Sequence, residues 1–528
     1  MGCFDRFLGL RNDLKLVGLS LGAFLALIDI YTALISFYTI AIDTQTPWMA
    51  IWSIIGHQIA FAASIPFYEG LIDMQYQNAV FIMSSIIFSV SSAAASWTNA
   101  AALVAAFRAI KGLGAAGMFT TAAADVSTTA CKATRCAKLV GPLWGGIIGA
   151  ACMEYKGWNW MYWLNGVSGV FSLVCYLCGR RDDEWRESPS RTGFMQLDIA
   201  GAILFAIATF LVVAISQTAV DAFYEPDLVF PTFVAVAISL FVIAIFWFWE
   251  RRSKQTYRFI QIPRNGSNNG ALFSRAIHAG LIGFIWDATI FSLTLGYQLV
   301  DTPPRFFVYY PALWSAIRLL WIIIPSRVGI FIGAATINKQ FLHPNSVSLT
   351  GSILVVFSVT MFSLSGRFPV RFFNTLQSIA MGTGFGLHLA AFDYIGINNP
   401  SPLSSSSFVL SSQRVPSSDE EEGGGTEDED EEEEDLEMET EDFLSSPQRN
   451  DDEIPQAKLE AIHVFGGVIG ISLVHMILHY NCRNRNDCGK SAFEKSFTVS
   501  TPLVLLVSVC VFIALFFVNK MTKADRRV

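Results

Sequence analysis

The chain has 528 residues, of which 52% are hydrophobic and only 15% are charged. A soluble globular domain carries about a quarter of its residues as charges, so this chain has too few charges to cover a soluble particle of its size. The net charge of −8 is misleading, because the window from Asp419 to Glu453 alone carries −19 and leaves the rest of the chain at +11.

The first part of the chain contains six apolar runs, which follow a polar N-terminus at 1–14 and predict a six-helix bundle over 15–178. Lipid offers backbone amides no hydrogen-bond partner, so a spanning segment must satisfy them within a helix. About 20 residues of helix cross the hydrocarbon core. The predicted spans of this bundle are 15–40, 47–68, 78–96, 101–124, 138–153 and 160–178.

The fifth of these runs is shorter than the others. Only 15 apolar residues, from Leu139 to Met153, follow the basic residues of the preceding loop. That length falls short of the about 20 residues needed to span a bilayer. Two explanations stay open: a genuinely short helix with local thinning of the bilayer, or a sequence that has lost a segment here.

The second half of the chain continues the pattern with two linker helices over 198–249 and a second bundle. The first part of that bundle covers 276–398, its last two helices lie within 456–519, and 520–528 forms a cytoplasmic tail. The total of fourteen spans predicts an all-α membrane protein with helices arranged as 6 + 2 + 6. The predicted spans of this half are 198–217, 228–249, 276–297, 308–336, 348–365, 370–392, 462–480 and 499–519.

A polar insert at 399–455 separates the twelfth and thirteenth spans. It is rich in Ser and Pro and then strongly acidic, so it cannot bury enough apolar surface to fold and is expected to be disordered in the cytoplasm. A solvated insert is the simpler interpretation. The alternative is a regulatory segment, since Ser417 and Ser418 precede acidic residues as acid-directed kinases prefer, and blocks of like charge often bind partners.

Basic residues predict the orientation, because they concentrate in the cytoplasmic loops of membrane proteins. The loop after the fourth span holds Lys132, Arg135 and Lys138, whereas the loops at 41–46 and 97–100 hold no Lys or Arg. This alternation predicts a multi-pass membrane protein with both termini in the cytoplasm. The basic residues of the loop at 481–498 are an exception to the pattern.

Short motifs recur along the chain in a fixed order. Together they resemble the fungal-type, fourteen-span drug:proton antiporter branch of the major facilitator superfamily. The resemblance implies a two-bundle major facilitator fold and proton-driven export. It also suggests a plasma-membrane location, and a vacuolar membrane stays open as the alternative. The motifs are Asp29 with Thr39-Ile40-Ala41, Trp52 with Pro66, Arg108 with Gly112 and Gly114, Gly141-Pro142 with Gly145-Gly146, Trp158 to Asn165, and Asp198 with Gly201.

The chain also departs from the pattern of this branch. The loop between the second and third spans keeps the acidic residue, Asp73, but has Gln77 where the branch has an Arg. The resemblance assigns this loop to gating of the cytoplasmic side, so these departures put gating in doubt. Further departures are Lys111 in place of a Gln and Asn159 in place of an Arg.

A proton-coupled exporter needs ionisable groups at membrane depth, where charges are costly and mark functional sites. The resemblance gives Arg108 a role in proton coupling, and the alternative is an interfacial Arg that extends outward. Asp29, in the middle of the first span, is a partner, a proton carrier or a structural hydrogen-bonded residue. Asp287 is a candidate substrate or proton site, and Arg318 could pair with it.

The Gly141, Pro142, Gly145 and Gly146 motif supplies small residues for close helix approach. Its proline removes an amide donor and bends the helix. One interpretation is helix packing alone. The resemblance to the antiporter branch favours a packing role that also sets the direction of transport.

The expected function is proton-coupled export of small amphipathic organic compounds by alternating access, with the bilayer, protons and the substrate as partners. Two alternatives stay open: a siderophore or metabolite transporter of the same fold, and a decayed paralogue that does not transport. The chain shows no catalytic Ser-His-Asp cluster, Walker loop or HExxH motif, so no enzyme activity, cofactor or nucleic-acid partner is expected. His388 and Asp393 are further candidates, whereas His475 and His479 lack a third metal ligand.

Overall fold

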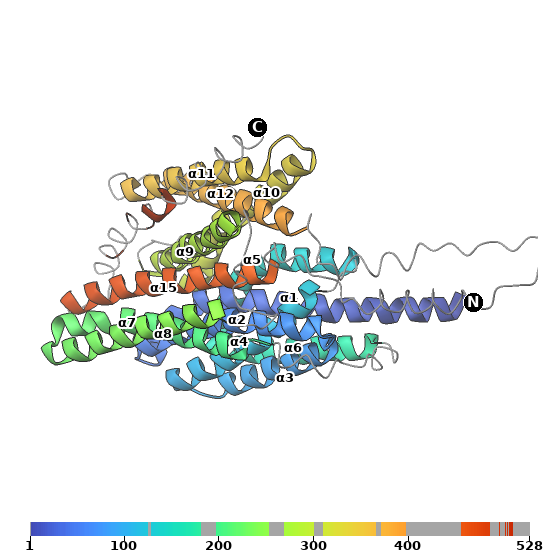
Figure 1. Cartoon of the computed structure of the whole chain (residues 1–528), viewed down its shortest axis with the longest axis horizontal. Coiled ribbons are helices and arrows are strands. Elements are labelled where there is room, and N and C mark those ends of the chain that lie inside the picture. The colour runs from blue at the N-terminus through green and yellow to red at the C-terminus, as the bar shows by residue number, and fades with distance from the viewer. Residues whose placement is uncertain are drawn as a thin grey trace, which may run out of the picture.

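The computed structural model describes residues 2–124, 128–180, 197–252, 269–299, 310–365, 371–397 and 456–485, and a few residues between 496 and 509. The described elements are helices (Figure 1). They are α1 (Gly2–Asp43), α2 (Pro47–Asp73), α3 (Gln77–Ser96), α4 (Ala101–Ala124), α5 (Thr128–Lys156), α6 (Trp158–Gly179), α7 (Ile199–Tyr224), the short 3-10 helix η3 (Pro226–Leu228), α8 (Val229–Arg252), α9 (Asn269–Leu299), α10 (Pro311–Asn338), α11 (Pro344–Ser365), α12 (Arg371–Ile397) and α15 (Gln456–Arg485).

Within the described residues, 11 helices are long and apolar enough to cross a membrane. The chain is therefore a multi-pass, all-α membrane protein. Most helices extend the predicted spans by a few residues, because a helix continues past the apolar stretch into the polar interface. The acidic insert, the tail and most of the predicted span 499–519 lie outside the described residues.

The fifth helix is longer than the predicted span at 138–153, whose apolar run covers only its second part. α5 runs over 29 residues, from Thr128 to Lys156. At a rise of about 1.5 Å per residue this is about 43 Å of helix, which is long enough to cross the hydrocarbon core. The apolar run begins only at Leu139 because the first turns of the helix carry basic and hydroxyl residues, so both explanations of its short length stay open.

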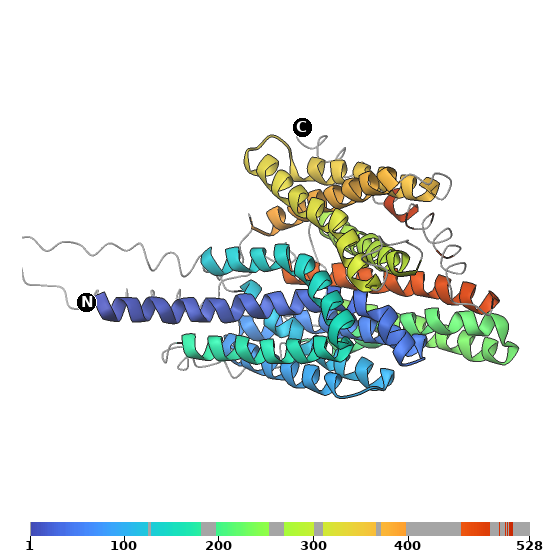
Figure 2. The same cartoon turned by 180° about the vertical axis from the view of Figure 1, so that it is seen from behind.

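The first six helices form one bundle, in which α1 packs against α5 and α6 and α4 packs against α2 and α3. In the second bundle α10, α11 and α12 pack together, and α9 pairs with α15. Figures 1 and 2 show α9 and α15 on the side of the second bundle that faces α1. Buried residues from both bundles share one core, where the rings of Phe37 and Phe291 lie 5.3 Å apart.

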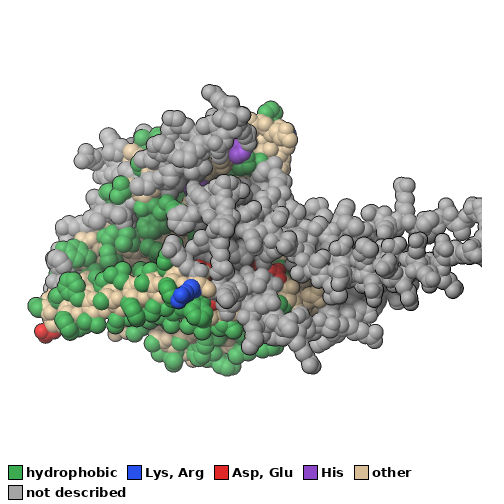
Figure 3. All heavy atoms as spheres, viewed as in Figure 1, with side chains coloured by type: hydrophobic (Ala, Val, Ile, Leu, Met, Phe, Trp, Pro, Cys, Tyr) green, Lys and Arg blue, Asp and Glu red, His purple; other side chains and the backbone are tan. Residues whose placement is uncertain are grey.

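The linker helices α7 and α8 lie side by side at one edge of the molecule (Figure 1). Asp198 begins α7 by accepting hydrogen bonds from the Gly201 amide and the Trp249 indole, both at 2.8 Å. Many large apolar side chains of α8 are exposed, including Phe230 and Phe241. The described surface over these helices is largely hydrophobic (Figure 3), as expected for side chains that contact lipid tails.

Candidate functional site

A buried cluster of charged side chains lies inside the first bundle. Asp29 of α1, His57 of α2, and Arg108 and Lys111 of α4 are each 0% exposed. Asp29 lies near the middle of an apolar span from Asp13 to Asp43, so the cluster lies at membrane depth. Charges at this depth are costly and are retained for a function or a partner.

Asp29 is the acidic centre of this cluster. Its Oδ1 lies 2.6 Å from the Lys111 Nζ, and its Oδ2 lies 3.2 Å from the Arg108 Nη2. The amide of Asn165 on α6 donates to Oδ1 at 2.8 Å, and the His57 Nε2 lies 3.6 Å from Oδ2. One carboxylate therefore holds α1 to α4 and α6.

Arg108 is held on three further sides. Its Nε donates to the backbone carbonyl of Ser53, and its Nη1 donates to the Tyr162 hydroxyl at 3.3 Å. Its own carbonyl lies 3.2 Å from the His57 Nδ1. The alternative of an interfacial arginine that extends outward is therefore wrong. The predicted pairing of Arg108 with Asp29 is present in the structure.

Lys111, His57 and Asn165 were not among the predicted site residues. Lys111 lies one helical turn after Arg108, so the i, i+3 spacing of two basic residues on one helix face was a usable signal. Its ammonium also lies 4.7 Å from the centre of the Phe88 ring. An ammonium over an aromatic face is attracted by the ring quadrupole.

The Gly-Pro motif of α5 packs against α1. A Cβ added at Gly145 would lie 2.8 Å from the carbonyl oxygen of Ile28, and one at Gly141 would lie 3.3 Å from Leu27. Gly146 faces α1 and α10, and Pro142 lies inside the helix. The motif therefore places α5 tightly against the helix that carries Asp29.

The two bundles meet at polar contacts near the middle of α9. Asp287 accepts a hydrogen bond at 3.3 Å from Gln58 of α2, and it is 7% exposed. The Trp286 indole donates to the Tyr31 hydroxyl at 3.1 Å. Nearer the end of both bundles, Glu154 of α5 accepts from the first turn of α10, from Ala312 N at 2.7 Å. Asp287 therefore lies at the bundle interface.

The predicted pairing of Arg318 with Asp287 is wrong, because the two side chains are not neighbours. Its guanidinium lies 5.2 Å from the Tyr297 ring and 5.6 Å from the Trp314 ring. Tyr297 follows Asp287 by ten residues on α9, which is about 15 Å of helix rise. The helical register therefore separates the two charges.

The predicted gating loop is a tight turn between α2 and α3. Asp73 is the last residue of α2, and Gln75 has a positive φ of 66°. Gln77 donates to the Thr121 carbonyl of α4 at 3.4 Å, and the Tyr176 hydroxyl of α6 donates to Asn78. Neutral hydrogen bonds thus tie the start of α3 to its neighbours where the resembled family has charged side chains.

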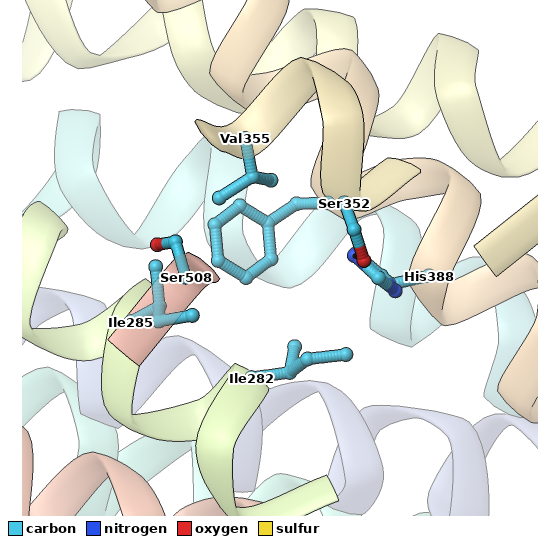
Figure 4. A pocket seen from close by; sticks show the side chains of 7 residues that line it. Ile282, Ile285, Ser352, Val355, His388 and Ser508 are labelled. Carbon is cyan, nitrogen blue, oxygen red and sulfur yellow. Dashed lines mark hydrogen bonds between the residues drawn. The ribbon is translucent and has the colours of Figure 1, made fainter. Parts of the chain in front are cut away.

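A second polar cluster lies in the other bundle. Ser348 lies 3.4 Å from the His278 Nε2 and 2.8 Å from the His388 Nδ1, and the His388 Nε2 lies 3.3 Å from Ser352. His388 and Ser352 line a small cavity between α9, α11 and α12 (Figure 4). The side chain of Asp393 lies outside the described residues.

The paired histidines of α15 face α7. His475 Nδ1 lies 2.5 Å from Gln217 Oε1, and His479 Nε2 lies 3.4 Å from Asp221 Oδ1. Among the described residues no three His, Cys, Asp or Glu side chains are grouped to hold a metal ion. These histidines therefore join α15 to the linker helices.

Curated relatives of the chain are transporters and export proteins. The chain is 20% identical over 360 residues to the MFS-type transporter FPY5 of Fusarium mangiferae, across 65% of this chain and 59% of that protein. It is 24% identical over 404 residues to the efflux pump FUS6 of Gibberella fujikuroi, across 71% of this chain and 68% of FUS6. The multidrug export protein EmrB of Escherichia coli K12 is 24% identical over 253 residues, which are 46% of this chain and 48% of EmrB. The chain is thus similar in sequence to MFS-type transporters and efflux pumps.

Solved structures show the major facilitator fold itself. The nucleoside transporter NupG aligns with a TM-score of 0.54 over 96% of this chain and 99% of NupG, at 11% identity. A bacterial homologue of the human drug peptide transporters PepT1 and PepT2 aligns with a TM-score of 0.55 over 98% of this chain and 99% of that chain, at 12% identity. No protein-family model matches the chain. Against FPY5, the match spans about three fifths of the relative's length.

Proposed function

We propose that this major facilitator protein is a secondary transporter that exports small amphipathic organic compounds, driven by the entry of protons. The observation that carries the proposal is the cluster of Asp29, Arg108 and Lys111, which is fully buried among membrane-spanning helices. Such a cluster offers a site where a proton changes the charge that holds helices together. The names of the relatives FUS6 and EmrB support export as the direction.

Alternating access would proceed by movement of the two bundles around a site near the bilayer midplane. Several described contacts join the bundles and must change in such a movement, among them Asp287 with Gln58, Trp286 with Tyr31, and Glu154 with the start of α10. The position of Asp287 at the interface suits a substrate or proton site. Arg318 suits a substrate contact. Its guanidinium lies near the rings of Tyr297 and Trp314, which shows that aromatic groups can bind it.

The same proposal includes a plasma-membrane location, which the motif resemblance suggests, and both termini in the cytoplasm, as the basic loops predict. In that orientation the end of α2 at Asp73 faces the cytoplasm. The Gly141–Gly146 motif of α5 would transmit movement of α1 to α10, since α5 packs on both. The acidic insert at 399–455 would then be accessible to a cytoplasmic kinase.

The test is dye transport in inside-out vesicles from yeast that lacks its own drug exporters. A proton gradient should drive a lipophilic fluorescent cation into vesicles that contain this protein, and a protonophore should abolish this uptake. Arg108→Ala should abolish it as well, because the charge cluster loses its central cation. Lys156→Ala is the matched control, since this exposed cation lies at the end of α5.

Two outcomes would contradict the proposal. Uptake that does not respond to the protonophore would favour a transporter that is not coupled to protons. No uptake of any of several amphipathic dyes, with normal membrane insertion and intact folding, would favour the decayed paralogue. A siderophore or metabolite transporter would accumulate iron chelates or polar metabolites and ignore the dyes.

A further inference from the structure

Lys111 gives the buried cluster one positive charge too many. The charged and titratable groups that face it are Asp29 of α1, His57 of α2, Arg108 of its own helix and Tyr162 of α6. The other neighbours, Phe88 of α3 and Asn165 of α6, carry no charge. Two cations therefore share a single carboxylate.

An uncompensated charge at membrane depth is costly. The cluster becomes neutral if one of its two cations loses a proton. Arg108 does not lose its proton in proteins, whereas a buried lysine does so readily. The remaining pair of Arg108 and Asp29 would then be balanced.

No other group in the cluster can balance the charge at a similar cost. A proton added to Asp29 would leave two cations without an anion, and a proton added to His57 would bring a third positive charge. Loss of the Tyr162 proton would create a new buried anion, whereas loss of the Lys111 proton removes a buried charge. Burial favours the neutral form of both a phenol and an amine.

We infer that Lys111 is the group that binds and releases the transported proton, an inference that rests on the proposed function. The Lys111 ammonium gives one proton to water on the open side of the membrane and becomes an amine. It takes one proton back from water on the other side. A lysine at this position replaces the glutamine of the resembled family, so this departure is a functional feature of the chain.

The geometry links this proton to helix movement. A charged Lys111 holds Asp29 at 2.6 Å, and through it α1 to α4. A neutral Lys111 leaves Arg108 as the only cation on that carboxylate. α1 packs closely against α5 at Gly145, and α5 contacts the start of α10 through Glu154. Protonation of Lys111 thereby changes the contact between α1 and α4, and α1 is connected to the second bundle through α5.

The first experiment measures the proton itself and needs no substrate. Isotope-labelled lysine side chains of the purified full-length protein in lipid nanodiscs are followed by NMR from mildly acidic to alkaline pH, and the Lys111 signal is assigned by its loss in Lys111→Gln. We expect this signal to change from ammonium to amine within that range, with one proton fewer released by the variant. A signal that stays an ammonium throughout would overturn the inference.

The second experiment measures transport. Lys111→Arg fixes the positive charge and Lys111→Gln fixes the neutral state, so both should lose accumulation driven by a proton gradient. Both should keep exchange of dye across the membrane when no gradient is applied. Proton-driven accumulation that persists in Lys111→Gln would overturn the inference while the proposed function stands. Titration of Lys111 in a protein that moves no dye would overturn the proposed function and keep the proton site.

Discussion

Replacing Asp29 with asparagine should destabilise the protein strongly, because it removes the acidic centre of the buried cluster and keeps its shape. The carboxylate oxygens lie 2.6 Å from the Lys111 Nζ and 3.2 Å from the Arg108 Nη2. Without the carboxylate, both cations are buried and unpaired. Removal of one partner of a buried ion pair costs about 3–5 kcal/mol, so we expect a loss of that size.

A double variant separates the charge effect from the effect of shape. Lys111→Gln alone should leave the stability unchanged or higher, since it removes the excess positive charge. Asp29→Asn combined with Lys111→Gln leaves one unpaired cation, so it should be more stable than Asp29→Asn alone, with a coupling of about 0.5–3 kcal/mol. The measurement is the unfolding midpoint in mixed micelles as denaturing detergent is added. An Asp29→Asn variant as stable as the native protein, or a double variant less stable than that single variant, would refute the charge argument.

Two other substitutions probe the helix packing and the second polar cluster. Gly145→Ala places a Cβ 2.8 Å from the Ile28 carbonyl oxygen and should cost about 1–3 kcal/mol through overpacking; Gly56→Ala, whose Cβ would lie 3.6 Å from its nearest neighbour, should be close to neutral in the same unfolding assay. His388→Leu removes the hydrogen-bond partner of two buried serines, Ser348 and Ser352. It should lower the free energy of unfolding by about 1–3 kcal/mol and leave dye transport unchanged. A loss of proton-driven transport without a loss of stability would instead show a direct role in transport.

The fold could be predicted because lipid forces each apolar run into a helix. Most predicted spans coincide with the described helices to within a few residues. Helices α1, α5 and α9 begin well before their predicted spans, because counting apolar residues does not detect polar first turns. The backbone hydrogen bonds of a helix are made within the helix itself, so a helix can extend beyond the segment that contacts the hydrocarbon core.

The charge cluster could be predicted in part. Asp29 is predictable because charges in apolar runs are rare, Arg108 is predictable from its motif, and the structure brings the two together. The sequence shows Lys111 only as a departure from a motif. It does not show that the side chain of Lys111 points at Asp29. The pairing of Asp287 with Arg318 failed because it was inferred from charge without the helical register that places Arg318 beside Tyr297.

In the proposed mechanism the buried cluster couples proton movement to substrate movement. The most direct test compares two modes of transport in proteoliposomes that contain either the native protein or Asp29→Asn. Native protein should accumulate dye against its gradient when a pH difference is imposed, and it should also exchange labelled for unlabelled dye without one. The variant should retain exchange and lose accumulation; a variant that still accumulates dye as the native protein does would contradict the account.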